Sequence, residues 1–139
     1  MPVMETLFIE QSDLVIQHFG YWPTFHDAEI LALSLDRNFA EGSPIMTLRV
    51  YAFEMTNKKV GRYFKLVKHC VIELELRDVF GNELDGFNHQ NAVNGISFKQ
   101  ENDLITCDID PAYGLGATIT AKRVIVKNLV PLANDPKRS

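Results

Sequence analysis

The chain lacks a run of apolar residues long enough to cross a membrane, and it lacks an excess of basic residues. No window approaches the roughly 18 apolar residues that a spanning helix needs. The 139 residues include 14 Lys and Arg against 18 Asp and Glu, which gives a formal net charge of -4. Because nucleic acids and anionic membranes are held by concentrated positive charge, the composition disfavours both as partners.

Cysteine is also scarce, and the N-terminal segment lacks the features of a targeting signal. Cys70 and Cys107 both fall at apolar positions of expected strands. We expect buried, reduced thiols, although strand pairing could also bring the two together in a disulfide. Residues 1–10 contain no basic stretch followed by a long apolar run, so the sequence predicts a cytoplasmic protein.

Length and composition are those of one ordinary folded domain. With 139 residues, 46% of them hydrophobic and 23% charged, the chain can bury a substantial core. No internal repeat or low-complexity segment divides it. We therefore predict a single domain over residues 1–133, followed by a flexible polar tail at residues 134–139.

One amphipathic helix is predicted near the N-terminus. Ser12 is placed to cap a helix that begins at Asp13, and Gly20 is placed to end it. Val15 and Phe19 are four residues apart and would share one face of this helix.

The rest of the chain has the pattern of strands joined by turns. Apolar and polar residues alternate, which indicates strands with one buried and one exposed face. The alternating segments are residues 28–36, 46–53, 63–77, 96–98, 105–110 and 117–126. Residues 54–62 and 78–91 lack the alternation and are predicted to be connections.

Two details of this pattern are specific enough to check. Leu31, Leu33 and Leu35 fall on one face of the first predicted strand. In the last strand the alternation changes phase across Lys122 and Arg123, which suggests a bulge or a strand break.

The order of these elements predicts the fold class. No helix separates one strand from the next, so antiparallel pairing is expected. The predicted fold is α+β: a mainly antiparallel sheet, curled or sandwich-like, with one short N-terminal helix packed on it.

The segment Tyr21–Ile30 fits neither a helix nor a strand pattern. It contains three aromatic residues, a proline, a histidine, two carboxylates and the only tryptophan of the chain. Pro23 disfavours helical backbone at Trp22, so the chain must turn here. Aromatic residues beside a proline usually pack a helix onto a sheet, and they also anchor protein partners.

Complete catalytic motifs are absent from the sequence. No serine lies in a Gly-x-Ser-x-Gly turn, and the turn Tyr113–Gly116 lacks the lysine of a phosphate loop. The residues that could form a zinc or iron site are His26, Asp27, Glu29, His69 and His89. Strand alternation places Asp27 and Glu29 on one face and His26 on the other. The sequence favours a simpler role, in which His26 and Asp27 satisfy backbone groups at a bend, and we expect no metal and no cofactor.

Four motifs follow one another along the chain. They are Gly20–Ile30 (GYWPTFHDAEI), Phe53–Thr56 (FEMT), Gly86–Asn91 (GFNHQN) and Ala112–Ala117 (AYGLGA). In these motifs, over residues 18–127, the sequence resembles the bacterial immunity protein 50 family. The resemblance implies a small cytosolic protein that binds and neutralises a cognate toxin domain of a polymorphic toxin system, without cofactor or turnover.

We therefore hypothesise a non-enzymatic immunity protein. The candidate partner-binding residues are Trp22, Phe25, His26, Asp27, Glu29, Glu54, Phe87, Asn88 and His89. A mildly acidic domain would suit a basic nuclease toxin, since complementary charge speeds association. Two alternatives stay open. One is a small-ligand or metal-dependent enzyme that uses the cluster His26, Asp27, Glu29 and His89. The other is a structural domain that forms a homodimer through an exposed strand edge.

Overall fold

The computed structural model describes residues 8–133, and most of its regular structure is strand. Strands make up 66% of these described residues, and one short helix makes up 6%. The predicted α+β class is therefore wrong, and the protein is nearly all-β. The strand content is higher than expected largely because two predicted connections are strand instead. Residues 54–60 extend β3, and residues 78–85 extend β4. The predicted tail, residues 134–139, lies outside the described residues.

The elements follow one another with short connections. In chain order they are β1 (Ile9–Glu10), α2 (Asp13–Phe19), β2 (Glu29–Asp36), β3 (Ile45–Val60), β4 (Tyr63–Asp85), β5 (Val93–Glu101), β6 (Leu104–Pro111) and β7 (Gly116–Pro131). They form one open sheet in the order β2-β3-β4-β7-β6-β5, with antiparallel pairing throughout. The short strand β1 pairs in parallel with β7.

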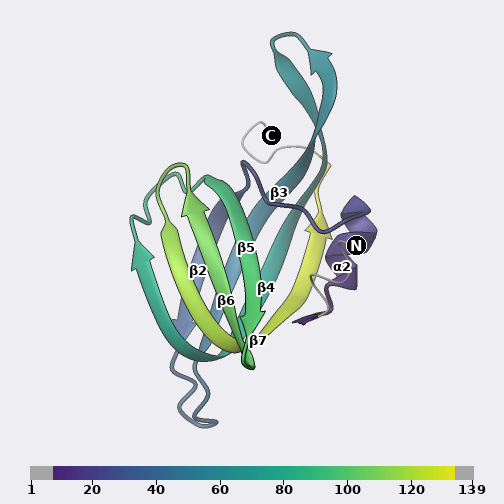
Figure 1. Cartoon of the computed structure of the whole chain (residues 1–139). Helices are drawn as coiled ribbons and strands as arrows, with labels where there is room; N and C mark the ends of the chain where they lie inside the picture. Colours follow the sequence, from purple (N-terminus) through teal and green to yellow (C-terminus); the bar gives the residue numbers. More distant parts are fainter. Residues whose placement is uncertain (1–7, 134–139) are drawn as a thin grey trace.

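The two long strands β4 and β7 bend the sheet onto itself. β7 pairs with β6 as far as Ala121, and at Val124 it pairs with β1 instead. In β4, Asp78 has a left-handed backbone with φ 55, and the N–H of Val79 donates to the carbonyl of Pro44 at 3.1 Å. Figure 1 shows β5 and β6 lying in front of β2 and β3. The two halves of the sheet therefore face each other.

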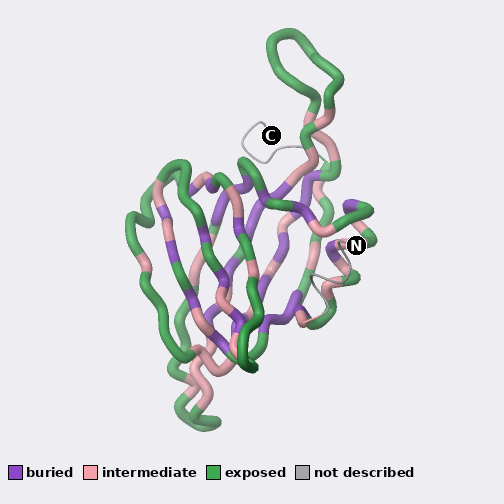
Figure 2. Tube along the Cα trace, viewed as in Figure 1, coloured by how far each residue is buried: buried purple, intermediate pink, exposed green. Residues whose placement is uncertain are grey.

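Apolar side chains from both halves form one core. Leu48 and Leu74 come from one half, Cys107 and Ile119 come from the other, and all four are fully buried in a single cluster. Figure 2 shows buried positions alternating with exposed ones along these strands. Full burial of one Leu or Ile side chain is worth about 1.5–3 kcal/mol, so this core is the main source of stability.

The helix α2 covers β7 and β4. It ends where predicted, because Gly20 has φ 90 and its N–H donates to the carbonyl of Ile16. Val15 and Phe19 are buried, as their shared face predicted. Ser12 precedes the helix, but its side chain makes no capping hydrogen bond. No helix within residues 8–133 is long and apolar enough to cross a membrane.

Both of the specific strand predictions need correction. In β2 the register with β3 shifts between Ile30 and Ala32, so Leu31 is a bulge and is exposed, whereas Leu33 packs against the core. A bulge re-aims one side chain and changes the phase of the pattern. In β7 the strand is continuous through Lys122 and Arg123, and its register with β4 does not shift there. The change of phase occurs where β7 leaves β6 and reaches β1.

Candidate functional site

The segment Tyr21–Ile30 connects the two edges of the open sheet. The N–H of Asp27 donates to the carbonyl of Val93 at 2.9 Å, and the N–H of Ile30 donates to the carbonyl of Asn91 at 3.0 Å. Two further backbone hydrogen bonds are Val93 N to Ala28 O (2.9 Å) and Ile96 N to Thr24 O (3.1 Å). The start of β2 is therefore fastened to the start of β5, and the curled sheet is closed at this end.

Two residues of this segment have backbone conformations that are rare outside glycine. Phe25 has φ 67 and Asp27 has φ 65. Such a conformation is unusual for a bulky residue and persists only where the surroundings enforce it. Phe25 is buried, and its ring packs edge-on against Trp22, which in turn packs against Phe98 of β5 at 6.0 Å between ring centroids. Aromatic packing therefore holds the strained turn in place.

Asn91 is the hydrogen-bonding centre of this end of the sheet. The side chain lies at 3% exposure, and its Oδ1 accepts from the backbone N–H groups of Asn88 at 3.0 Å and Leu115 at 3.1 Å. Its Nδ2 donates to the carbonyl of Asn88 at 2.8 Å. Its own N–H points to Glu29 Oε2 at 3.4 Å. The side-chain amide of Asn91 thus joins the loop at residues 86–91 to the turn before β7, and its backbone connects both to the start of β2.

Two glycines allow the backbones to approach Asn91 this closely. Gly114 has φ 77, and a Cβ there would collide with the carbonyl oxygen of Gln90 and with Oδ1 of Asn91. Gly86 has φ 83, and a Cβ there would lie 2.6 Å from the carbonyl oxygen of Gly114. Three of the four sequence motifs therefore meet at one point in space.

Five of the nine predicted site residues are exposed at this end, and we call them the rim. The rim residues are His26, Asp27, Phe87, Asn88 and His89. His26 Nδ1 lies 3.0 Å from the carbonyl oxygen of Asn94, and His26 Nε2 lies 3.5 Å from Asp27 Oδ2. Phe87 is 53% exposed. The rim is an exposed polar surface with one aromatic side chain, held on a backbone that is fixed from beneath.

The other four predicted residues are buried or partly buried. Phe25 and Glu29 are buried, at 3% and 8% exposure. Trp22 and Glu54 are partly buried. A hollow of about 250 Å³ between the residues 21–26 and 52–55 includes both Trp22 and Glu54 in its lining. These four side chains position the rim or line the hollow beside it.

Glu54 belongs to a polar cluster that the sequence predicted only in part. The Tyr21 hydroxyl donates to Glu54 Oε1 at 2.7 Å, and Lys68 Nζ lies 3.4 Å from the same oxygen. Lys68 Nζ also donates to the carbonyl of Phe19 at the end of α2. The hydrogen bond from Tyr21 lowers the pKa of Glu54, while burial and Glu54 raise the pKa of Tyr21 to about 12. The cluster fastens the first motif to the second.

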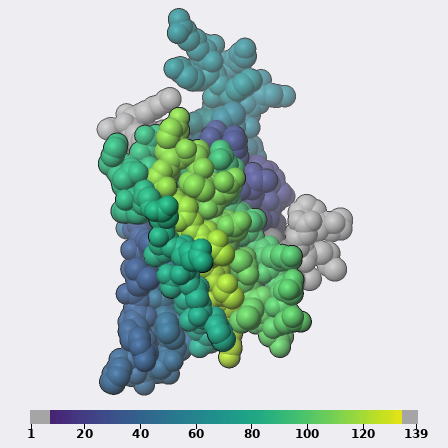
Figure 3. All heavy atoms as spheres, turned by 60° about the vertical axis from the view of Figure 1, so that its left-hand side comes forward, coloured from purple at the N-terminus to yellow at the C-terminus, as the bar shows by residue number. Residues whose placement is uncertain are grey.

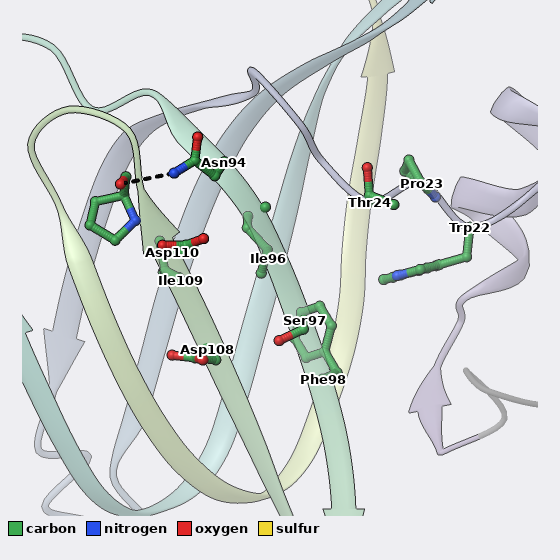
Figure 4. A pocket seen from close by; sticks show the side chains of 12 residues that line it. Trp22, Pro23, Thr24, Asn94, Ile96, Ser97, Phe98, Asp108, Ile109 and Asp110 are labelled. Atoms are coloured by element: carbon green, nitrogen blue, oxygen red, sulfur yellow. Dashed lines mark hydrogen bonds between the residues drawn. The ribbon is translucent and has the colours of Figure 1, made fainter.

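A shallow groove of about 620 Å³ runs beside the rim along β5 and β6. Figure 4 shows Asp108 and Asp110 on β6 and the ring of Trp22 on the other side of β5. Both carboxylates are exposed, and Asn94 Nδ2 donates to the carbonyl of Pro111 at 3.2 Å. The groove combines an indole with negative charge, so it could accept a basic side chain.

The residues of the hypothesised metal site do not come together in the described structure. Within residues 8–133, no group of three or more His, Cys, Asp or Glu side chains is arranged to hold a metal ion. His69 is buried beside Tyr51, with 2.7 Å between Nδ1 and the hydroxyl oxygen, and its Nε2 lies 3.3 Å from the carbonyl oxygen of Leu66. Both nitrogens of His69 therefore have protein partners.

The cysteines are poorly suited to nucleophilic chemistry. Cys70 and Cys107 are buried free thiols. Burial raises the pKa of each thiol to about 12. Since the thiolate is the reactive form, neither side chain is a nucleophile at neutral pH.

The nine candidate residues did not include Asn91, Tyr21 or the groove carboxylates, although Tyr21 and Asn91 lie in two of the sequence motifs. Asn91 is the last residue of the third motif and lies in the turn shortly before β5, where a side-chain amide often satisfies backbone groups. Asp108 and Asp110 alternate with core residues in β6, so their exposure was predictable. Their position beside Trp22 depends on the pairing of β5 with β6, which no local pattern specifies.

Within residues 8–133 the protein is a nearly all-β domain whose exposed rim is carried on hydrogen-bonded turns. The chain matches immunity protein 50 over residues 11–132 and belongs to that family. The family resemblance inferred from the four motifs is confirmed. No curated protein and no solved structure is significantly similar to the chain.

We predict that Asn91→Ala lowers the free energy of unfolding by about 3 kcal/mol, because it leaves two N–H groups and one carbonyl without their partner. Chemical denaturation measures this difference. Asn82→Ala is the matched control, since Asn82 is exposed on β4, and it should change stability by less than about 0.5 kcal/mol. A loss below about 1 kcal/mol for Asn91→Ala would show that Asn91 is not the hydrogen-bonding centre.

The Tyr21–Glu54 contact predicts a pH-dependent effect of Tyr21→Phe. The pKa of Glu54 is lowered from 4.5, so its contribution to stability is present above pH 4.5 and is lost as the pH falls further. The pKa of Tyr21 is raised from 10.0 to about 12, so its contribution is present below pH 10.0 and is lost as the pH rises towards 12. Wild type should therefore exceed Tyr21→Phe in stability by about 1 kcal/mol between these limits, and by less outside them.

Urea denaturation at a series of pH values measures this difference. Tyr63→Phe is the control, because Tyr63 is highly exposed on β4. A stability difference for Tyr21→Phe that does not vary with pH would contradict the contact.

Proposed function

We propose that this chain is a non-enzymatic immunity protein that binds and neutralises a toxin domain in the cytoplasm. Membership of the immunity protein 50 family supports a protective role. The partner would be the cognate toxin of a polymorphic toxin system, and neither a cofactor nor a metal is needed for inhibition by binding.

The observation that carries this proposal is the fixed backbone beneath the rim. Loops that carry binding residues are usually mobile, and ordering them on association reduces affinity. Here the loop at residues 86–91 is held by Asn91, and the turn at residues 24–28 is held by hydrogen bonds to residues 93–96. The rim can therefore meet a partner without a large loss of conformational entropy.

The chemistry of the rim also suits a protein partner. Phe87 offers an exposed ring in the same loop as the exposed polar residues Asn88 and His89. Aromatic side chains are common anchors of protein interfaces. The neighbouring groove adds Asp108 and Asp110, which favour a partner with basic side chains on the facing surface.

We predict that Phe87→Ala weakens binding to the toxin domain encoded beside this gene by about tenfold or more, as expected for loss of an aromatic anchor. Asp27→Asn should also weaken binding, since it removes the charge while keeping a side chain that tolerates positive φ. Calorimetry with purified proteins measures affinity, and survival of cells that express the toxin measures protection.

Phe39→Ala is the matched control. Phe39 is 85% exposed in the β2–β3 connection, at the opposite end of the sheet from the rim (Figure 1). This variant should bind and protect as wild type does. If all three variants are folded and protect equally, the rim is not the inhibitory surface. If wild type does not bind the toxin, the proposed function itself is wrong.

A further inference from the structure

The strands β3 and β4 continue beyond the sheet as a two-stranded hairpin, residues 55–66, which we call the arm. Beyond Met55 the described pairing of β3 is with β4 alone, and β4 first pairs with β7 at Cys70. Figure 1 shows the arm projecting past the sheet, and Figure 2 shows it as largely exposed. In the space-filling view of Figure 3 it stands clear of the rest of the molecule. The arm therefore contributes little to the core.

The side chains of the arm are unusual for a solvated hairpin. Met55, Val60, Tyr63 and Phe64 are all large, apolar or aromatic, and exposed, with Tyr63 at 71%. A two-stranded hairpin alone is marginally stable in water, and exposed apolar groups without a partner do not stabilise it. The exposure of these apolar side chains is best explained by a binding partner whose surface covers them in the complex.

The charge of the arm is opposite to that of the rest of the chain. Residues 55–66 contain four of the 14 Lys and Arg residues and none of the 18 Asp and Glu residues. The four cations are Lys58, Lys59, Arg62 and Lys65. Lys59 Nζ lies 5.7 Å from the ring centroid of Phe64, so one cation is already placed over an aromatic face. The arm is a basic, aromatic projection on an acidic domain.

The base of the arm is anchored and hollowed. Tyr51 and His69 stack there as a buried pair, with 2.7 Å between the hydroxyl oxygen and Nδ1. Thr56 Oγ1 donates to the carbonyl of Lys65 at 2.8 Å across the hairpin. A groove of about 750 Å³ lies between the arm and residues 132–133. The anchored base gives the arm a fixed direction, and the groove beside it can accept a side chain of a partner.

We propose that the arm is a second contact element that docks against an acidic, partly apolar surface of the toxin domain. This inference rests on the proposed function. Tyr63 and Arg62 at the tip are of the residue types that dominate binding energy in interfaces, and the four cations would speed association with an acidic surface. Met55 lines both the arm groove and the hollow next to Trp22, so the arm and the rim side form one continuous surface.

A protein fits the arm better than a nucleic acid does. A duplex would need cations spread along its backbone, whereas the arm offers four within one hairpin. The remainder of the chain carries all 18 acidic side chains against ten basic ones, which repels an extended polyanion. The exposed Met55 and Val60 have no role in phosphate binding, but they fit an apolar protein surface.

The test is a charge reversal with a matched control. Lys58→Glu with Arg62→Glu reverses two charges in the arm, and Lys122→Glu with Lys127→Glu makes the same net change on exposed positions of β7. We expect the arm variant to associate with the toxin domain at least about tenfold more slowly than the control variant at low salt. The difference in association rate between the two variants should become smaller at about 0.5 M salt, where screening is strong.

An aromatic pair tests the apolar part of the contact. Tyr63→Ala should weaken binding by about tenfold, whereas Phe80→Ala should not, although Phe80 is similarly exposed on β4. Because the arm lies outside the core, the arm variants should melt at the wild-type temperature, which circular dichroism checks.

The outcomes separate this proposal from the proposed function. If wild type binds the toxin and the arm variants behave as their controls do, the arm proposal is wrong and the immunity function stands. If wild type does not bind the toxin, both fail. If wild type binds a DNA duplex in a way that the arm reversal abolishes, or forms a dimer that the reversal disperses, the arm serves a nucleic acid or a second copy, and the proposal is overturned.

Discussion

The structure at the rim depends on one buried side-chain amide. Asn91 accepts two backbone hydrogen bonds and donates one, and its backbone connects to Glu29 and Ile30 at the start of β2. An antiparallel sheet that curls without closing leaves two edges, and unpaired edges are prone to association. The bonds around Asn91 and Asp27 join those edges at one end. The family motifs thus have a structural role, because they join the two edges of the sheet. The exposed side chains of the rim lie on the same segments.

This arrangement would let a small domain separate its stability from the proposed binding. The core between the two halves of the sheet holds the fold, while the rim and the arm project from it with few core contacts. The rim presents histidine, carboxylate and aromatic groups beside an acidic groove, and the arm presents cations and aromatics. A partner that contacts both the acidic groove and the basic arm would need complementary charges of both signs. Such complementarity favours specificity more than affinity.

The sequence predicted which segments form the helix and the strands better than it predicted the lengths of the strands and the contacts between distant segments. The helix ended at Gly20, and most core positions of the strands followed from alternation. The fold class was wrong partly because residues 56–60, which lack the alternation of a strand, pair across a hairpin, and pairing with a neighbour overrides a poor local pattern. Leu31 was misplaced because a bulge depends on register with β3. The convergence of three motifs on Asn91 could not be predicted, since it depends on which edges meet when the sheet curls.

The most direct test of this account is amide hydrogen exchange of the wild-type protein, followed by nuclear magnetic resonance. The N–H groups of Asn88 and Leu115 lie in turns, yet both donate to Asn91 Oδ1. If Asn91 holds the rim rigid, both should exchange nearly as slowly as the N–H of Ile30, because all three open only when this end of the sheet opens. Exchange of Asn88 and Leu115 as fast as the exposed arm would contradict the account.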